Sequence, residues 1–158
     1  MNQHIYSATL VVHVVGIVLM AGTAFIDLFT FRYFWKRYGE DKEQGLVVEN
    51  IAFGLQRFMG VGMLLILLSG IGMMAYLHQV WGQQLWFRIK MAVLVLIIVN
   101  GLGLRRALGN KLRRILGADA TTDVALQLSK VKARMTIIQY LQLLLFIVIF
   151  TLSVFKFN

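Results

Sequence analysis

Four long apolar stretches constrain this chain more than any other feature of its sequence. They cover approximately residues 8–31, 58–77, 86–104 and 136–155. A transmembrane helix needs roughly 20 predominantly apolar residues, and all four stretches are near that length. They are too long for strands, period-2 alternation is absent, and the chain has no proline to break a helix. The sequence therefore predicts an all-α integral membrane protein in which residues 1–158 form one four-helix bundle, running up-down-up-down.

Basic residues are unevenly distributed among the segments that join these stretches. Lys and Arg are frequent between the first and second stretches and between the third and fourth, whereas residues 1–7 and 78–85 contain none. Because Lys and Arg collect on the cytoplasmic side of a membrane, we expect both basic connections in the cytoplasm and both termini outside. Topology and anionic lipid account for the net charge of +9, so no nucleic-acid partner is expected. The absence of cysteine excludes disulfides and thiolate metal sites.

Apolar residues at helical spacing continue the stretches into the basic connections. They are Val47, Val48, Ile51 and Leu55 before the second stretch, Leu108, Leu112, Ile115 and Leu116 after the third, and Val124, Leu128, Val131 and Met135 before the fourth. We expect the third helix to end near Gly117 and the fourth to begin at Thr122. Because the connection at 78–85 is short, the second and third helices are predicted to be antiparallel neighbours.

Two ionisable side chains, His13 and Lys90, lie within apolar stretches, and the expected topology puts both in the outer half of the membrane. Ionisable groups in hydrocarbon are costly and usually mark a functional site. His13 can ligate a metal or haem iron through one ring nitrogen while an acceptor holds the other, or it can be a neutral histidine bonded between helices. Lys90 can coordinate as a neutral amine, or its ammonium can extend to the headgroups. The residues alone leave these alternatives open.

Other polar residues indicate contacts between helices in the inner half. We expect Asp27 to form an ion pair with Arg57 or Arg32, and Gln139 and Gln142 to hydrogen-bond across the bundle. The frequent glycines of the first three stretches predict close helix packing or room for a flat ligand.

Methionines offer a different chemistry at the outer end of the second stretch. Met74 and His78 are four residues apart and share a helix face. With Met73 or Met20 they form a candidate set of soft ligands for Cu(I). The ordinary role of such methionines is apolar filling.

Several short motifs occur in a characteristic order along the chain. They are His13 followed by Gly16, then Arg57 with Leu67-Leu68-Ser69-Gly70, then Trp86 with Lys90 four residues later, and finally Lys156 in an apolar C-terminal run. Together they resemble the HemJ-type protoporphyrinogen oxidase family and its relatives, the copper-resistance D-like membrane domains. Two family features are missing. Gln139 and Tyr140 stand where the family has an Asn-Glu-x-Pro-like motif, and Asn100 stands near a further histidine of the third helix.

The resemblance implies a b-type haem with His13 and Lys90 as axial ligands of the iron, and with Arg57 and Trp86 as further cofactor-binding residues. The implied function is a redox protein of the bacterial inner (cytoplasmic) membrane that exchanges electrons with a porphyrin or a quinone, as a protoporphyrinogen oxidase does. The missing motifs favour haem binding over the family's porphyrinogen chemistry. The alternatives are copper transport or buffering and a structural membrane subunit without a cofactor. Membrane lipid is the expected surrounding, and formation of a homo-oligomer is left open.

Overall fold

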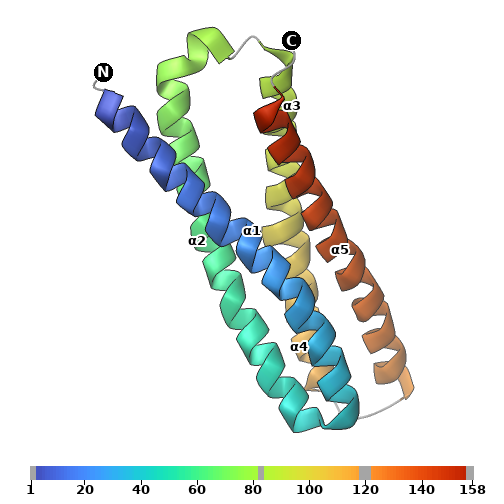
Figure 1. Ribbon diagram of the computed structural model, residues 1–158. Helices are drawn as coiled ribbons and strands as arrows, with labels where there is room; N and C mark the ends of the chain where they lie inside the picture. The colour runs from blue at the N-terminus through green and yellow to red at the C-terminus, as the bar shows by residue number, and fades with distance from the viewer. Residues whose placement is uncertain (1–2, 82–83, 118–121, 156–158) are drawn as a thin grey trace.

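The structure, a computed structural model, describes residues 3–81, 84–117 and 122–155, and in these ranges all regular structure is helical. The elements are α1 (Gln3–Glu40), α2 (Lys42–Trp81), α3 (Leu85–Ile98), η1 (Val99–Leu104), α4 (Arg105–Leu116) and α5 (Thr122–Val154). Because α3, η1 and α4 follow one another without a break, they form one rod, and the chain is a bundle of four rods (Figure 1). The side chains of His78 and Trp81, and all of Lys156, lie outside the described residues.

All four rods are long and apolar enough to cross a membrane, as the sequence predicts. Large apolar side chains face outward along them, including Val11, Val18, Ile71, Ile137 and Ile147. Such an apolar exterior suits lipid and would be unusual in water. The helices α1, α2 and α5 contain 38, 40 and 33 residues, whereas about 20 cross the hydrocarbon region. The helices therefore continue past the apolar stretches into the basic connections, as predicted.

The rods alternate in direction, so both termini lie at the same end of the bundle as the connection between α2 and α3 (Figure 1). The prediction that this end is outside rests on the charge asymmetry and is still a prediction. The closest packing is between α1 and α2, while α3 and α4 pack against α5. The helices α2 and α3 are antiparallel and line the same cavity, but they pack less closely than α1 and α2 do. The short connection joins two pairs of rods that separate at this end.

A single residue, Asp41, separates α1 from α2. Its side-chain Oδ1 accepts hydrogen bonds from the backbone N–H groups of Glu43 at 2.9 Å and Gln44 at 3.3 Å, which satisfies donors left unpaired at the start of a helix. Gly45 lets the two backbones approach, because a Cβ there would lie 2.7 Å from the Cα of Tyr38. This tight turn brings α2 back along α1 over most of their lengths.

Two apolar clusters fill the bundle. One lies in the membrane part and contains Met20, Met63, Ile97 and Phe146. The other lies in the extensions and includes Phe31, Phe34, Leu112, Ile115, Val131 and Met135. The predicted stripes on α4 and α5 are thereby confirmed. The stripe on α2 is only partly correct, because Val48 packs against this cluster whereas Val47 and Ile51 are exposed.

The third rod contains one π-helical segment, η1, which the sequence did not predict. The backbone N–H of Arg105 donates to the carbonyl of Asn100, five residues earlier. A π-turn of this kind is rare and often occurs at functional sites. It precedes Arg105 directly and so sets the angular position of that side chain.

Candidate functional site

A cavity of about 420 Å³ lies in the half of the bundle that contains the termini, and all four rods line it. His13 and Met20 come from α1, Gly70 from α2, Lys90 from α3 and Phe146 from α5. The wall is otherwise apolar, with Ser153 as its only further hydroxyl or charged group among the described residues. The separation of α2 from α3 makes room for it. The predicted pair His13 and Lys90 therefore lines one shared cavity.

The orientation of His13 follows from its partner, Ser69 on α2. The single hydroxyl hydrogen of Ser69 is directed at the carbonyl oxygens of Leu65 and Ile66 on its own helix. We therefore assign the Ser69 oxygen as the acceptor of the hydrogen bond that joins it to His13 Nδ1, 2.9 Å away. In the neutral ring Nδ1 then carries the hydrogen and Nε2 keeps its lone pair. This is the arrangement in which a protein holds a metal-ligating histidine.

Lys90 is half-buried on α3 and lies near enough to His13 for the two groups to interact electrostatically. Trp86, one turn earlier, is buried. Its ring packs edge-to-face on Phe87 with centroids 5.8 Å apart, and its Nε1 donates to the side-chain oxygen of Gln84. Phe87 lines the cavity and Trp86 does not. The predicted residue Trp86 thus supports the cavity wall from behind.

Arg57 is not brought to this cavity. It is exposed on α2 and does not line the cavity. Twelve residues separate Arg57 from Ser69, which is roughly 18 Å along a helix. Of the four residues predicted to bind a cofactor, the structure brings His13 and Lys90 together at the cavity, Trp86 behind it, and Arg57 elsewhere.

Four methionines line the same cavity, namely Met20, Met73, Met74 and Met91. The sequence predicted three of them as soft ligands together with His78, whose side chain lies outside the described residues. Among the described residues there is no group of three or more His, Asp or Glu side chains that could hold a metal ion. A metal in this cavity would therefore need thioether or amine ligands besides His13.

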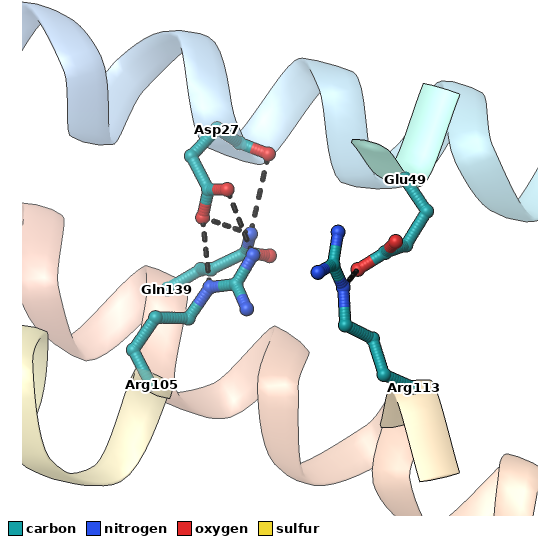
Figure 2. Close-up of polar contacts among 5 residues, drawn as sticks. All are labelled: Asp27, Glu49, Arg105, Arg113 and Gln139. Carbon is teal, nitrogen blue, oxygen red and sulfur yellow. Dashed lines mark hydrogen bonds and ion pairs between the residues drawn. The ribbon is translucent and has the colours of Figure 1, made fainter. Parts of the chain in front are cut away.

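A second polar site lies deeper in the bundle, where Asp27 of α1 meets Arg105 of α4 (Figure 2). Arg105 donates from Nε at 3.0 Å and from Nη2 at 2.8 Å to the two carboxylate oxygens. Gln139 of α5 donates to the same carboxylate at 2.7 Å. The prediction that Gln139 bonds across the bundle is confirmed. The two-point fork is the strongest pairing geometry available to arginine.

The predicted partners of Asp27, Arg57 and Arg32, are both wrong. Arg57 is exposed, and Arg32 donates to the hydroxyl of Tyr140. Arg105 directly follows η1, and its guanidinium also lies over the ring of Phe31 at 5.8 Å. Figure 2 shows a further ion pair nearby, from Arg113 of α4 to Glu49 of α2 at 2.8 Å. Together these pairs tie the third rod to α1 and α2.

Sequence reasoning gave no role to Ser69, which it noted only as part of a motif, or to Arg105. Ser69 is the one serine or threonine in the apolar stretch 58–77, and an isolated hydroxyl at membrane depth usually has a partner. Arg105 was counted only among the basic residues of a connection. A search for the basic residue nearest to the apolar stretch on each helix would have included it.

Comparisons with protein-family models, with curated proteins and with solved structures found no match to this chain. The functional argument therefore rests on the cavity and its side chains.

Proposed function

We propose that this protein binds b-type haem in the cavity between the four rods and acts as a redox protein of the bacterial inner membrane. The observation that carries the proposal is the contact between His13 and Ser69, 2.9 Å apart. It fixes the ring so that Nε2, a nitrogen with a lone pair, is available on a residue that lines the cavity. Haem iron is commonly held by such a histidine.

The other properties of the cavity fit the same ligand. Its volume of about 420 Å³ lies within the range of roughly 300–1,000 Å³ that is usual for cofactor sites. Its walls are mainly aliphatic, aromatic and thioether groups, which suit a flat apolar macrocycle. Gly70 leaves space beside the imidazole, because a Cβ there would lie 3.9 Å from His13 Cε1.

Each side chain then has a distinct role. His13 would hold the iron through Nε2, and Ser69 would keep the ring from rotating. Lys90 on α3 would supply a second ligand as a neutral amine. The apolar wall would exclude water from the bound cofactor. When bound, haem supplies reversible one-electron transfer, and the electron partner we propose is a porphyrin or a quinone.

The test is the visible absorption spectrum, with iron and copper analysis, of the detergent-purified protein after incubation with hemin. We expect a Soret band with one haem per chain. His13→Ala should abolish haem retention, whereas His4→Ala, which changes an exposed histidine of the same helix, should keep it. Folded His13→Ala protein with full haem content would contradict the proposal.

One observation favours a second candidate function, the binding of Cu(I). Met20, Met73, Met74 and Met91 line the cavity with His13, and thioethers with an imidazole are the soft ligands that Cu(I) prefers. The same measurement separates the two candidates, because copper without a Soret band would support copper transport or buffering. If the purified protein binds neither copper nor haem, that result would favour a structural membrane subunit.

A further inference from the structure

Three amide side chains meet where η1 faces α5, away from the 420 Å³ cavity. They are Asn100 on η1 and Gln139 and Gln142 on α5, and each is at most 4% exposed. All three line a small cavity of about 10 Å³. Buried amides usually have hydrogen-bond partners. An amide atom without a partner here therefore indicates the kind of ligand that the cavity would hold.

The partners of each amide fix which end is oxygen and which is nitrogen. Asn100 contacts the backbone carbonyl of Ile138 at 3.0 Å, so the contacting atom must be the donor Nδ2. The same nitrogen lies 2.7 Å from Gln142, which therefore presents its oxygen there. Gln139 contacts the carboxylate of Asp27 at 2.7 Å and its backbone carbonyl at 3.2 Å, so that atom is Nε2. No amide can be reversed without placing two acceptors or two donors against each other.

Three atoms remain without a hydrogen-bond partner among the described residues. Two are acceptors, Asn100 Oδ1 and Gln139 Oε1, and one is a donor, Gln142 Nε2. A water molecule is complementary to this set, because it donates two hydrogen bonds and accepts at least one. The volume also suits one water molecule, whose centre needs roughly 10–15 Å³ of accessible space.

We propose that this cavity is a binding site for one water molecule, held by Asn100, Gln139 and Gln142. A cation would meet the N–H of Gln142 and the nearby guanidinium of Arg105, which also lines the cavity. An anion would meet two amide oxygens and the carboxylate of Asp27. Water is the only one of these three classes that satisfies all three atoms. It would extend the polar network from Asp27 through Gln139 to Asn100, and so connect the buried ion pair to the π-turn.

Substitution of Gly101 provides a test, because the direction of its effect on the melting temperature depends on whether the cavity holds a water molecule. A Cβ at Gly101 would lie 3.5 Å from Gln142 Nε2 and 3.5 Å from Met59 Sδ, which is ordinary contact. The methyl group of Gly101→Ala therefore fits the cavity but leaves no room for water. Gly103→Ala is the matched control, because Gly103 lies in the same π-helical segment and a Cβ there meets nothing within 4 Å.

In a dry cavity the methyl group would fill space, and Gly101→Ala would melt at or above the temperature of Gly103→Ala. If water is bound, its loss leaves three buried polar atoms unpaired. We then expect Gly101→Ala to melt several degrees below the control in the same detergent. Equal or higher stability of Gly101→Ala would overturn the proposal.

An experimental structure at high resolution gives a second measurement that does not depend on a variant. It should show one density peak within hydrogen-bonding distance of Asn100 Oδ1, Gln139 Oε1 and Gln142 Nε2, and the absence of that peak would overturn the proposal. The wild-type melting temperature should also be unchanged when sodium in the buffer is replaced by potassium or by an organic cation. A melting temperature that depends on the cation would identify a cation site instead.

Discussion

Gly16 of α1 and Gly62 of α2 meet backbone to backbone. A Cβ on either glycine would lie 2.9 Å from the carbonyl oxygen of the other. This contact lies about one turn from His13, so this close approach of the two helices also helps to set the distance from His13 to Ser69. Small residues allow such an approach between helices in lipid.

Gly62→Ala should therefore separate α1 from α2. The new methyl group would lie 2.8 Å from the backbone nitrogen of Met20, and backbone atoms cannot move as a flexible side chain can. Overpacking of this kind costs about 1–3 kcal/mol. Thermal unfolding in detergent measures it, with Gly60→Ala as the control because a Cβ at Gly60 meets nothing within 4 Å. Equal melting temperatures for the two variants would show that α1 and α2 leave room for a methyl group at Gly62.

Asp27→Asn should destabilise the protein far more than a surface change does. Asp27 is 3% exposed and Arg105 is 5% exposed, so removing the carboxylate charge leaves a buried guanidinium uncompensated. Breaking such a pair costs about 3–5 kcal/mol. The comparison is with Glu43→Gln, an exposed carboxylate of α2. If both variants unfold at the same temperature, water reaches Asp27.

Ser69→Ala should weaken haem binding without removing His13. The alanine cannot accept the hydrogen bond from Nδ1, so the ring loses the contact that fixes its orientation. Loss of such a partner typically reduces metal affinity by about 10–100-fold. Hemin titration measures the change. Ser153→Ala is the control, because Ser153 lines the same cavity but donates to Ile149 of its own helix. A Ser69→Ala protein with wild-type affinity would mean that Ser69 does not orient the ligand.

Lys90→Ala should retain some haem and shift its spectrum towards a five-coordinate or water-ligated form. Lys90→Arg should not restore the wild-type spectrum, because a guanidinium has no usable lone pair. An amine ligand must lose its proton to bind, so in the wild-type protein this ligation should weaken as the pH falls. A pH titration of the visible spectrum would detect the change. Rescue by arginine would indicate that Lys90 acts through its charge.

A reporter fused after Asn158 should behave as extracytoplasmic. Lys and Arg concentrate at the opposite end of the bundle, and such residues stay in the cytoplasm. Alkaline phosphatase activity of the fusion would support this orientation, with a fusion in the basic connection near Gly117 as the cytoplasmic control. The reverse pattern would place the His13 cavity in the cytoplasmic half.

The helices were predictable because each depends on local composition. Four apolar stretches of sufficient length give four rods, and the stripes on α4 and α5 follow from helical spacing. The pairing of rods was not predictable in the same way, because a short connection between α2 and α3 says only that their ends are close. Their separation depends on how well α1 fits α2, and that fit depends on Gly16, Gly62 and the turn at Asp41.

The candidate site was predictable in part for a similar reason. The depth of His13 and Lys90 along their helices follows from the sequence, and depth alone puts them at one level. The partner of a polar group depends on helix rotation as well. Asp27 pairs with Arg105, which is buried, rather than with Arg57, which is exposed on α2. The π-turn in 99–104 affects the rotation of α4, and no residue pattern reveals it.

The π-turn makes the third rod a helix with two phases. A π-turn accommodates about one residue more than the α-helical turn it replaces, and one residue corresponds to roughly 100° of rotation. In a regular α-helix, Arg105 and Leu112 would lie roughly 60° and 40° around the axis from Lys90. The additional residue of η1 changes these angles by about one residue's rotation, so the buried positions before residue 99 and those after residue 104 follow different phases of the sequence. Loss of a single residue within 99–104 would turn η1 into an ordinary α-helical turn, and Lys90 and Arg105 would keep their positions at the cavity and at Asp27.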